Sequence, residues 1–224
     1  MSVSVIIPTW NGERYLGTAL DSVFAQTIQP LEVIVIDDGS TDNTADVARA
    51  YPVHLELCTH QGAAAARNTG VTLARGDYIA LLDCDDLWLP EKLELQLQTF
   101  AQVPELGVVF TAVQQFISRD TPEVKNQVQF VPEAQLLPST SALMARREAF
   151  DVAGLFPLLH SGDVMLWLAR VGQLGIGVQM LEQCLVKRRI HHSNMTRTQK
   201  DEVHQGYFKM LRQLLLEKRS RSNE

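Results

Sequence analysis

Hydrophobic runs and helical patterns alternate strictly through the first half of the chain. Hydrophobic runs typical of buried strands cover residues 3–8, 31–36, 53–58 and 76–82. Between these runs, hydrophobic positions recur at helical spacing in residues 13–26, 42–50 and 62–75. A strand–helix alternation of this kind predicts parallel strands with helices on both faces. We therefore expect an α/β fold with a mostly parallel central sheet flanked by helices, in a single domain.

The second half has a mixed pattern that predicts both helices and strands. Helical spacing covers residues 90–103, 146–153 and 163–174, and strand patterns cover residues 107–111, 113–118, 178–181 and 185–190. A further strand is expected near residues 128–131, and an amphipathic helix from residue 199. The sequence also predicts capping residues at two helix ends. Ser40 or Thr41 would cap the helix of residues 42–50, and Gly76 would end the helix of residues 62–75.

Two of the predicted strands end in clustered carboxylates. Asp37 and Asp38 follow the second strand, and Asp83, Asp85 and Asp86 follow the fourth. Because ligands of open α/β sheets bind beyond the carboxyl ends of the strands, these acids are expected to share one polar crevice. Clustered carboxylates favour a hard divalent cation such as Mg²⁺ or Mn²⁺, bound together with phosphate oxygens of a substrate. The alternative is that the acids cap helices in solvated turns.

The composition is that of an ordinary globular protein, but the charges are unevenly placed. The chain has 224 residues, a hydrophobic content of 46% and a net charge of −6, which argues against nucleic acid as its main partner. Residues 1–110 hold five Lys or Arg against fifteen Asp or Glu, whereas residues 183–224 hold ten against four. An acidic front half suits a metal site and a basic tail suits an anionic partner, although chance can produce the same distribution.

Cysteine spacing and the absence of targeting patterns bear on location. The three cysteines are widely separated and match neither a zinc site nor a disulfide framework. Met1 leads almost directly into a strand without the pattern of a signal peptide, and no hydrophobic stretch is long enough to span a bilayer. The sequence predicts reduced thiols and a cytoplasmic location, either free or on the cytoplasmic face of the membrane.

Four motifs occur in the first half in a defined order. They are residues 3–11 (VSVIIPTWN), 35–42 (VIDDGSTD), 66–70 (ARNTG) and 76–86 (GDYIALLDCDD). Together with residues 87–93, this order and spacing resemble the family 2 glycosyltransferases with the GT-A fold. The resemblance implies metal-dependent transfer of a sugar, with inversion, from a nucleotide diphosphate to a hydroxyl acceptor. UDP is the nucleotide expected.

The resemblance implies roles for several residues that would bind the nucleotide. Pro8 and Thr9 would line the nucleotide pocket. Asp38 would accept a hydrogen bond from the uracil ring, with Asp37 nearby. Arg67 would lie near the nucleotide or its diphosphate, and the alternative is a surface arginine on an Ala-rich helix.

Asp83 and Asp85 match the two acids of the family's DxD element. Asp83 would face the ribose or the sugar, Asp85 would bind Mn²⁺ or Mg²⁺, and Asp86 would support the site from behind. The cysteine between them is expected to pack rather than to bind metal. His191 ends a segment that resembles a family strand end whose histidine approaches the metal or diphosphate. His191 is therefore a second candidate ligand, and the alternative is a plain surface histidine.

An inverting transfer needs a base on the acceptor side, opposite the leaving diphosphate. Residues 161–170 resemble the family segment that carries this base, which makes Asp163 the candidate. Gly162 and Met165 depart from the family pattern, so a non-catalytic nucleotide-sugar-binding homologue stays open as an alternative. Asp163 as the N-cap of the helix of residues 163–174 is the simpler reading, and it is compatible with the catalytic one.

We divide the chain into a donor-binding half, residues 1–110, and an acceptor-binding half, residues 111–224. The expected partners are a nucleotide sugar and a saccharide or lipid-linked acceptor, as in the synthesis of cell-surface polysaccharide or glycolipid. The C-terminal helix either packs back on the domain or holds the enzyme against an anionic membrane. Nothing resembles the signature of processive synthases, so single addition is expected.

Two other enzyme classes fit the sequence less well. A nucleotidyltransferase would carry a Gly-rich loop with a basic residue after the first strand, and residues 9–12 lack it. An NAD-dependent oxidoreductase would carry Gly-x-Gly-x-x-Gly at the same place.

Overall fold

The computed structural model describes residues 1–127, 130–194, 201, 205, 206, 208 and 212. Its strands are β1 (Val3–Thr9), β2 (Glu32–Asp37), β3 (His54–Leu57), β4 (Tyr78–Leu81), β5 (Leu87–Trp88), β6 (Leu106–Ile117), β7 (Met144–Arg146) and β8 (Gly177–Ile190). Its helices are α1 (Leu16–Phe24), α2 (Thr44–Arg49), α3 (Ala63–Leu73), α4 (Lys92–Gln102), α5 (Arg147–Ala153) and α6 (Asp163–Gln173), with short 3₁₀ helices η1 (Pro122–Gln127) and η2 (Thr140–Ala142).

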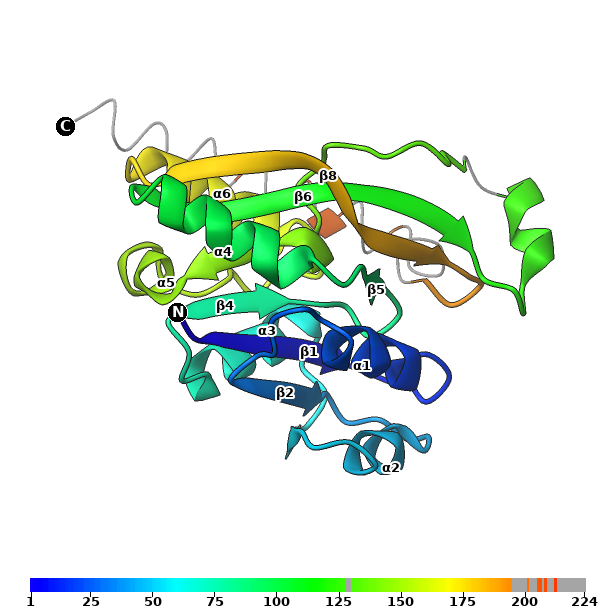
Figure 1. Cartoon of the computed structure of the whole chain (residues 1–224). Coiled ribbons are helices and arrows are strands. Elements are labelled where there is room, and N and C mark those ends of the chain that lie inside the picture. Colours follow the sequence, from blue (N-terminus) through cyan, green and yellow to red (C-terminus); the bar gives the residue numbers. More distant parts are fainter. Residues whose placement is uncertain (128–129, 195–200, 202–204, 207, 209–211, 213–224) are drawn as a thin grey trace.

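The strands of the described residues form one sheet in the order β3-β2-β1-β4-β7-β6-β8-β5. β1 is parallel to β2 and β4, and β2 is parallel to β3. Every residue of β1 and β4 is buried, because α1 and α4 lie on the near face of the sheet in Figure 1 while α3 and α6 lie behind it. The predicted α/β fold is confirmed, and the first half follows the predicted alternation.

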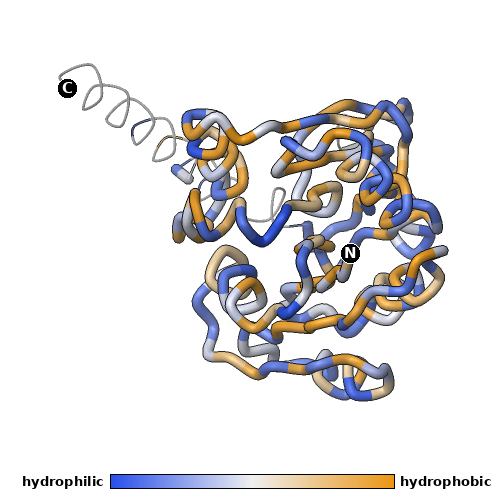
Figure 2. Tube along the Cα trace, turned by 60° about the vertical axis from the view of Figure 1, so that its left-hand side comes forward, coloured by the Kyte–Doolittle hydropathy of each residue, from blue (hydrophilic) through white to orange (hydrophobic). Residues whose placement is uncertain are grey.

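The hydropathy of the chain follows these layers. The buried core takes residues from β1, β2, β4 and β6 together with the inner faces of α1 and α4. In Figure 2, hydrophobic and hydrophilic stretches alternate along the trace, and the residues of β1 and β4 are all buried. The strand ends therefore emerge from an apolar core directly into polar turns, which concentrates the chemistry of the chain at one edge of the sheet.

The second half of the sheet has fewer and longer strands than the sequence predicts. β7 pairs antiparallel with β4 and β6, while β8 runs parallel to β6 and antiparallel to β5. Residues 107–118 form one strand instead of two, and so do residues 178–190, because register shifts near Ala112 interrupt the pattern without breaking the strands. We call residues 113–117 of β6 with residues 186–190 of β8 the β6–β8 arm (Figure 1).

Three local expectations need correction or lie beyond the described residues. α2 begins at Thr44 after Asn43, so neither Ser40 nor Thr41 caps it. α3 ends at Leu73 with Ala74 as its C-cap, and Gly76 instead lets the chain pass close to β1, where an added Cβ would lie 2.7 Å from the Ser4 nitrogen. Of the strand expected at residues 128–131, residues 128–129 lie outside the described residues and residues 130–131 are not in a strand.

The predicted C-terminal helix is described at only a few positions. Residues 201, 205, 206, 208 and 212 are helical, and the rest of that helix lies outside the described residues. Gly206 is buried, and an added Cβ there would collide with Ser161 just before α6, so the helix packs against the domain at this point. In the described part of the chain, no helix is long and apolar enough to cross a bilayer. The three cysteines are free.

Candidate active site

A buried arginine lies between two carboxylates from distant parts of the chain. Arg67, on α3, donates from Nη1 to Asp163 Oδ2 at 2.7 Å and from Nη2 to Asp83 Oδ1 at 3.2 Å. Asp83 follows β4 and Asp163 begins α6, so one side chain links an acid of the DxD element to the candidate base. Arg67 is only 7% exposed, and the alternative of a surface arginine is therefore wrong.

Burial and charge oppose each other in this bridge. Burial disfavours the charge on Arg67, but the carboxylates of Asp163 and Asp83 outweigh it and hold the pKa of Arg67 above its ordinary value. Burial raises the pKa of Asp83, although Arg67 opposes the shift. Nε of Arg67 is buried and has no hydrogen-bond partner among the described residues. Buried polar groups are normally satisfied, so this N–H marks a place where a ligand oxygen or a water fits.

Asp85 lies in a second cluster, at the turn after β8. His191 Nε2 is 3.0 Å from Asp85 Oδ2, and Asn194 Nδ2 donates to the same oxygen at 3.1 Å. The backbone N–H of His191 donates to Asn194 Oδ1 at 2.7 Å, which fixes the turn. The ring of His191 packs against Tyr15, with centroids 4.4 Å apart. His191 is 4% exposed, so the alternative of a plain surface histidine is wrong, and the two candidate metal ligands lie together.

Asp86 lies behind this cluster and ties the acidic turn to two other elements. Its Oδ2 accepts from Ser141 Oγ at 2.7 Å, and its Oδ1 accepts from the backbone N–H of Arg189 at 3.0 Å. Ser141 Oγ also accepts from the N–H of Asp83 at 3.1 Å, and Arg189 Nε donates to the carbonyl of Asp85 at 2.9 Å. Burial, and then repulsion from the two neighbouring carboxylates, raises the pKa of Asp86 well above its ordinary value. The sequence did not single out Ser141 or Arg189 for these contacts.

Six residues form what we call the acidic centre: Arg67, Asp83, Asp85, Asp86, Asp163 and His191. Cys84, between the DxD acids, is not part of its chemistry. Burial raises the pKa of the Cys84 thiol to about 12, so the sulfur is a neutral packing atom and not a thiolate ligand.

Pro8 and Thr9 end β1, between the ends of β2 and β4. Thr9 pairs in parallel register with Asp37, and its carbonyl accepts from the N–H of Asp38 at 2.8 Å. An added Cβ at Gly12 would collide with the Thr9 hydroxyl and lie 3.2 Å from the sulfur of Cys84. The loop after β1 therefore packs directly on the acidic turn, which places the predicted nucleotide-binding residues beside the acidic centre.

Asp37 and Asp38 shape the end of β2 through hydrogen bonds to the backbone. Asp37 Oδ1 accepts from the N–H of Ser40 at 2.8 Å. The two oxygens of Asp38 accept from the N–H groups of Gln61 and Gly62, each at 2.8 Å, and so hold the loop that precedes α3. Neither residue caps α2. A carboxylate has about four acceptor positions, so Asp38 keeps capacity for a ligand, and its contact with uracil stays a prediction. No hydrogen bond joins this pair to the acidic centre in the described part of the chain.

An exposed aromatic pair lies beside Asp38 and was not selected from the sequence. The rings of Trp10 and His60 have centroids 4.7 Å apart at an interplanar angle of 30°. His60 Nδ1 lies 2.9 Å from Asp38 Oδ2. Flat, exposed rings next to a carboxylate suit a planar base. The available signal was position, because Trp10 directly follows Thr9 and His60 lies two residues before Gly62, the N-cap of α3.

Asp163 is the first residue of α6 and Gly162 is its N-cap, with φ of 81°. Asp163 as the N-cap is therefore wrong, and its side chain bonds to Arg67 instead. A backbone in the left-handed region favours glycine, so Gly162, one of the two departures from the family pattern, is what the local chain path requires. Met165, the other departure, is 41% exposed on α6.

The chemistry of Asp85 and His191 fits a divalent metal that is also held by substrate. No group of three or more His, Cys, Asp or Glu suited to a metal occurs among the residues described. Mg²⁺ and Mn²⁺ in nucleotide sites usually take one or two protein ligands and complete their shell with phosphate oxygens and water. A carboxylate and an imidazole 3.0 Å apart supply such a partial set.

These features define an α/β protein with an acidic crevice at the carboxyl ends of its strands and a buried arginine that links that crevice to a separate carboxylate. Residues 4–154 match the family model for glycosyl transferase family 2, and the chain belongs to that family. An uncharacterized glycosyltransferase of Nostoc sp. is 30% identical over 87% of this chain and 66% of its own length.

Two further relatives have more informative names. The putative teichuronic acid biosynthesis glycosyltransferase TuaG of Bacillus subtilis is 30% identical over 87% of this chain and 81% of its own. The UDP-Glc:alpha-D-GlcNAc-diphosphoundecaprenol beta-1,3-glucosyltransferase WfgD of Escherichia coli is 41% identical over 42% of this chain and 39% of its own. The chain thus spans about two thirds or less of the Nostoc and E. coli relatives.

Solved structures show the same fold at low sequence identity. The S. aureus TarS fragment 1–349 in complex with UDP-GlcNAc superposes with a TM-score of 0.68 at 22% identity, over 88% of this chain and 61% of that one. The mannosyltransferase PcManGT of Pyrobaculum calidifontis, in complex with GDP-Man and Mn²⁺, gives 0.63 at 24% identity, over 86% and 58%. The predicted GT-A fold is therefore confirmed.

Proposed function

We propose that this chain transfers a sugar from a nucleoside diphosphate, with UDP as the nucleotide, to a hydroxyl group of a saccharide or lipid-linked acceptor. The observation that carries this proposal is the Arg67 bridge, because it joins an acid of the DxD element to Asp163 in one buried contact. Support comes from the UDP-GlcNAc complex of TarS and from the names of TuaG and WfgD, which point to cell-envelope saccharides.

In this proposal Asp163 is the base and the transfer inverts the anomeric centre. The acceptor hydroxyl loses its proton to the carboxylate of Asp163 as its oxygen bonds to the anomeric carbon and the bond to the diphosphate breaks. Arg67 holds Asp163 Oδ2 at 2.7 Å, which fixes the carboxylate before substrate arrives. Its buried Nε–H lies in the same site and is free to donate to a substrate oxygen.

Asp85 and His191 would hold the divalent metal, Mn²⁺ or Mg²⁺. The metal supplies positive charge that stabilises the leaving diphosphate. Asn194, which shares Asp85 Oδ2 with His191, orients the carboxylate so that its other oxygen is available. Pro8, Thr9, Asp37 and Asp38 would bind the nucleoside. Trp10 and His60 add a flat surface for the base.

The donor-binding half is proposed to be residues 1–110 and the acceptor-binding half residues 111–224. The boundary falls inside β6, so the two halves share one sheet and cannot fold as separate units. A peripheral contact of the C-terminal helix with the cytoplasmic face of a membrane is part of the same proposal, because a lipid-linked acceptor would lie there. Flotation with anionic vesicles tests that contact.

Thermal unfolding with nucleotides tests the donor site. Wild type, Asp85→Ala and the control Asp46→Ala, which removes an exposed carboxylate on α2, are each heated with Mn²⁺ and a panel of nucleoside diphosphates. A ligand at ~100 times its dissociation constant should stabilise the wild type by about 2.7 kcal/mol. We expect a Mn²⁺-dependent shift with UDP that is kept in Asp46→Ala and lost in Asp85→Ala. If no nucleotide shifts the wild type, the donor site is wrong.

Asp163→Asn separates the enzyme from a non-catalytic nucleotide-sugar-binding homologue. The substitution keeps the size of the side chain but removes its basicity, so UDP release from a UDP-sugar should fall while the UDP-dependent thermal shift persists. A wild type that binds UDP and never releases it from any UDP-sugar, with or without saccharide acceptors, would establish the non-catalytic alternative.

A further inference from the structure

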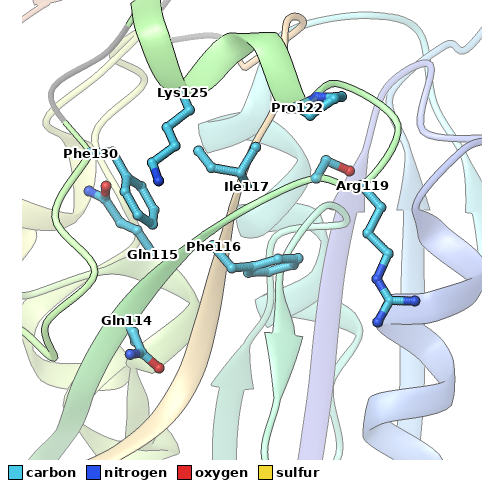
Figure 3. Close-up of a pocket in the computed structure, with 9 residues that line it drawn as sticks. Gln114, Gln115, Phe116, Ile117, Arg119, Pro122, Lys125 and Phe130 are labelled. Atoms are coloured by element: carbon cyan, nitrogen blue, oxygen red, sulfur yellow. The ribbon is translucent and has the colours of Figure 1, made fainter.

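An open pocket of about 460 Å³ lies on the β6–β8 arm, and its lining includes no residue of the acidic centre. Figure 3 shows its lining: Gln115 and Ile117 come from β6, Lys125 extends from η1, and Phe130 lies beside Gln115 on the chain that follows η1. Phe116 lies on the opposite side of the same strand. The volume is within the ~300–1,000 Å³ typical of small-molecule sites.

We call this pocket the arm pocket. Two glutamines of β6 bond to the chain that follows Phe130. Gln114 Nε2 donates to the carbonyl of Pro132 at 2.6 Å, and the N–H of Val131 donates to Gln115 Oε1 at 3.2 Å. These bonds fasten the chain on the far side of Phe130 to the arm. Among the residues that the structure describes, only the amide oxygen of Gln115 is bonded, so its nitrogen is available to a ligand.

The arm pocket carries positive charge that the surrounding acids do not neutralise. Asp120 pairs with Arg14, and Glu123 pairs with His192, so both nearby carboxylates are engaged elsewhere. Lys125 has only a distant contact with the ring of Phe130, with Nζ 5.9 Å from the centroid. Within the part of the chain that the structure describes, Lys125 has no ionic partner.

The wall of the arm pocket leads directly to the acidic centre. The N–H of Ser118, a lining residue, donates to the carbonyl of Ile190 at 3.0 Å, and the next residue is His191. Phe116 packs against the guanidinium of Arg189 at 4.8 Å, and Arg189 Nε donates to the carbonyl of Asp85 at 2.9 Å. The arm pocket is therefore connected, through Ile190 and Arg189, to the turns that carry His191 and Asp85.

The chemistry of the lining matches a charged sugar. The face of an aromatic ring packs on the C–H groups of a sugar ring, and a primary amide bonds to hydroxyl groups. An unpaired ammonium adds a strong interaction with a carboxylate or a phosphate. We propose that the arm pocket binds a saccharide that carries an anionic group, a carboxylate or a phosphate, and that this saccharide is part of the acceptor. The acceptor assignment rests on the function proposed above.

Calorimetric titration with small saccharides tests the pocket. The probes are digalacturonic acid for the carboxylate, N-acetylglucosamine 1-phosphate for the phosphate and N,N′-diacetylchitobiose as the neutral saccharide. Each is titrated into wild type, Lys125→Gln, Phe130→Ala and the control Arg49→Gln, which removes an exposed cation on α2. We expect at least one anionic probe to bind more tightly than the neutral one. Lys125→Gln should weaken that probe about tenfold, and Arg49→Gln should leave it unchanged.

The outcomes separate this proposal from the proposed function. Equal affinity in Lys125→Gln and Arg49→Gln would overturn it, as would equal affinity of anionic and neutral probes, or no saturable binding of any probe. Lys125 is exposed, so Lys125→Gln should fold, and it carries the test if Phe130→Ala does not. The UDP-dependent thermal shift, read on the same samples, reports the donor site independently. A normal shift with no probe binding would overturn the arm pocket alone.

Discussion

In the acidic centre the carboxylates accept hydrogen bonds from the chain itself, whereas Lys125 of the arm pocket is exposed and has no ionic partner within the part of the chain that the structure describes. Arg67 lies between Asp83 and Asp163, and Asp86 accepts from Ser141 and a backbone N–H. Among the described residues, Lys125 has one distant contact, with the ring of Phe130. The acidic centre is organised by contacts within the chain, and the arm pocket presents a solvated cation.

The difference indicates how each region could act. A pre-arranged set of charges costs little reorganisation when a reaction begins, which suits the place where a bond is broken. A free cation on an exposed arm can bind and release an anion without disturbing the core. The two regions are joined through Arg189, so they differ in electrostatics while sharing one structural support.

Removing Arg67 should break the acidic centre and have the largest effect on stability. Arg67→Met leaves buried Asp163 and half-buried Asp83 without their common cation, and removing one partner of a buried pair costs about 3–5 kcal/mol. Chemical denaturation measures the loss. Arg67→Met combined with Asp163→Asn should lose less than the sum of the two single changes, because the residues share one contact. Simple additivity would show that the bridge does not act as a unit.

Ser141→Ala should lower the free energy of unfolding by removing hydrogen bonds that support the acidic centre. The change removes the hydrogen bond to buried Asp86 and the acceptor of the Asp83 N–H. Leaving such buried groups without partners costs about 1–3 kcal/mol. The hydroxyl of Ser141 also lowers the pKa of Asp86, so that pKa should rise further in the variant. The matched control is Ser139→Ala, two residues earlier, and an equal loss in both would contradict the assignment.

Lys92 sharpens the comparison because it is a fully buried lysine with no carboxylate partner among the described residues. Its Nζ donates to Gln96 Oε1 at 2.8 Å and lies 4.0 Å from the centroid of Trp88. Burial lowers the pKa of Lys92 well below its ordinary value of 10.5. The unfolded chain therefore binds a proton that the folded chain lacks between the lowered pKa and 10.5.

The free energy of unfolding should rise with pH through this window, by up to about 1.4 kcal/mol per pH unit. Lys92→Met abolishes this contribution. The unfolding free energy of the wild type minus that of the variant should therefore increase with pH. The measurement is denaturant unfolding of both proteins at several pH values. A difference that does not change with pH would show that Lys92 titrates normally in the folded protein.

Much of the parallel half could be predicted from sequence because its signals are local. Each strand is a short apolar run, and the acids come directly after it. The long strands β6 and β8 could not be predicted as single elements, because their continuity depends on pairing across a register shift near Ala112. Helix ends were also missed, since Asn43 and Ala74 flank α2 and α3 without the expected capping residues.

The candidate site, too, could be predicted only as far as its local signals reach. The sequence points to Arg67, Asp83 and Asp163 one by one, but the contact that joins them spans three elements and depends on how α3 and α6 pack. Ser141 lies in a segment with no acid, base or metal-binding signature, so nothing in the local sequence indicates its two hydrogen bonds. Buried networks between distant segments are set by packing, which a linear pattern does not record.

The contact between Arg67 and Asp163 also limits how this chain can be recombined with its relatives. The residues that match the family model end at 154, so they include the arginine and exclude its carboxylate partner. A chimera joined at that boundary would take the two from different parents and leave their spacing to chance. Working hybrids should therefore inherit α3 and α6 from the same parent, whatever the origin of the loops between them.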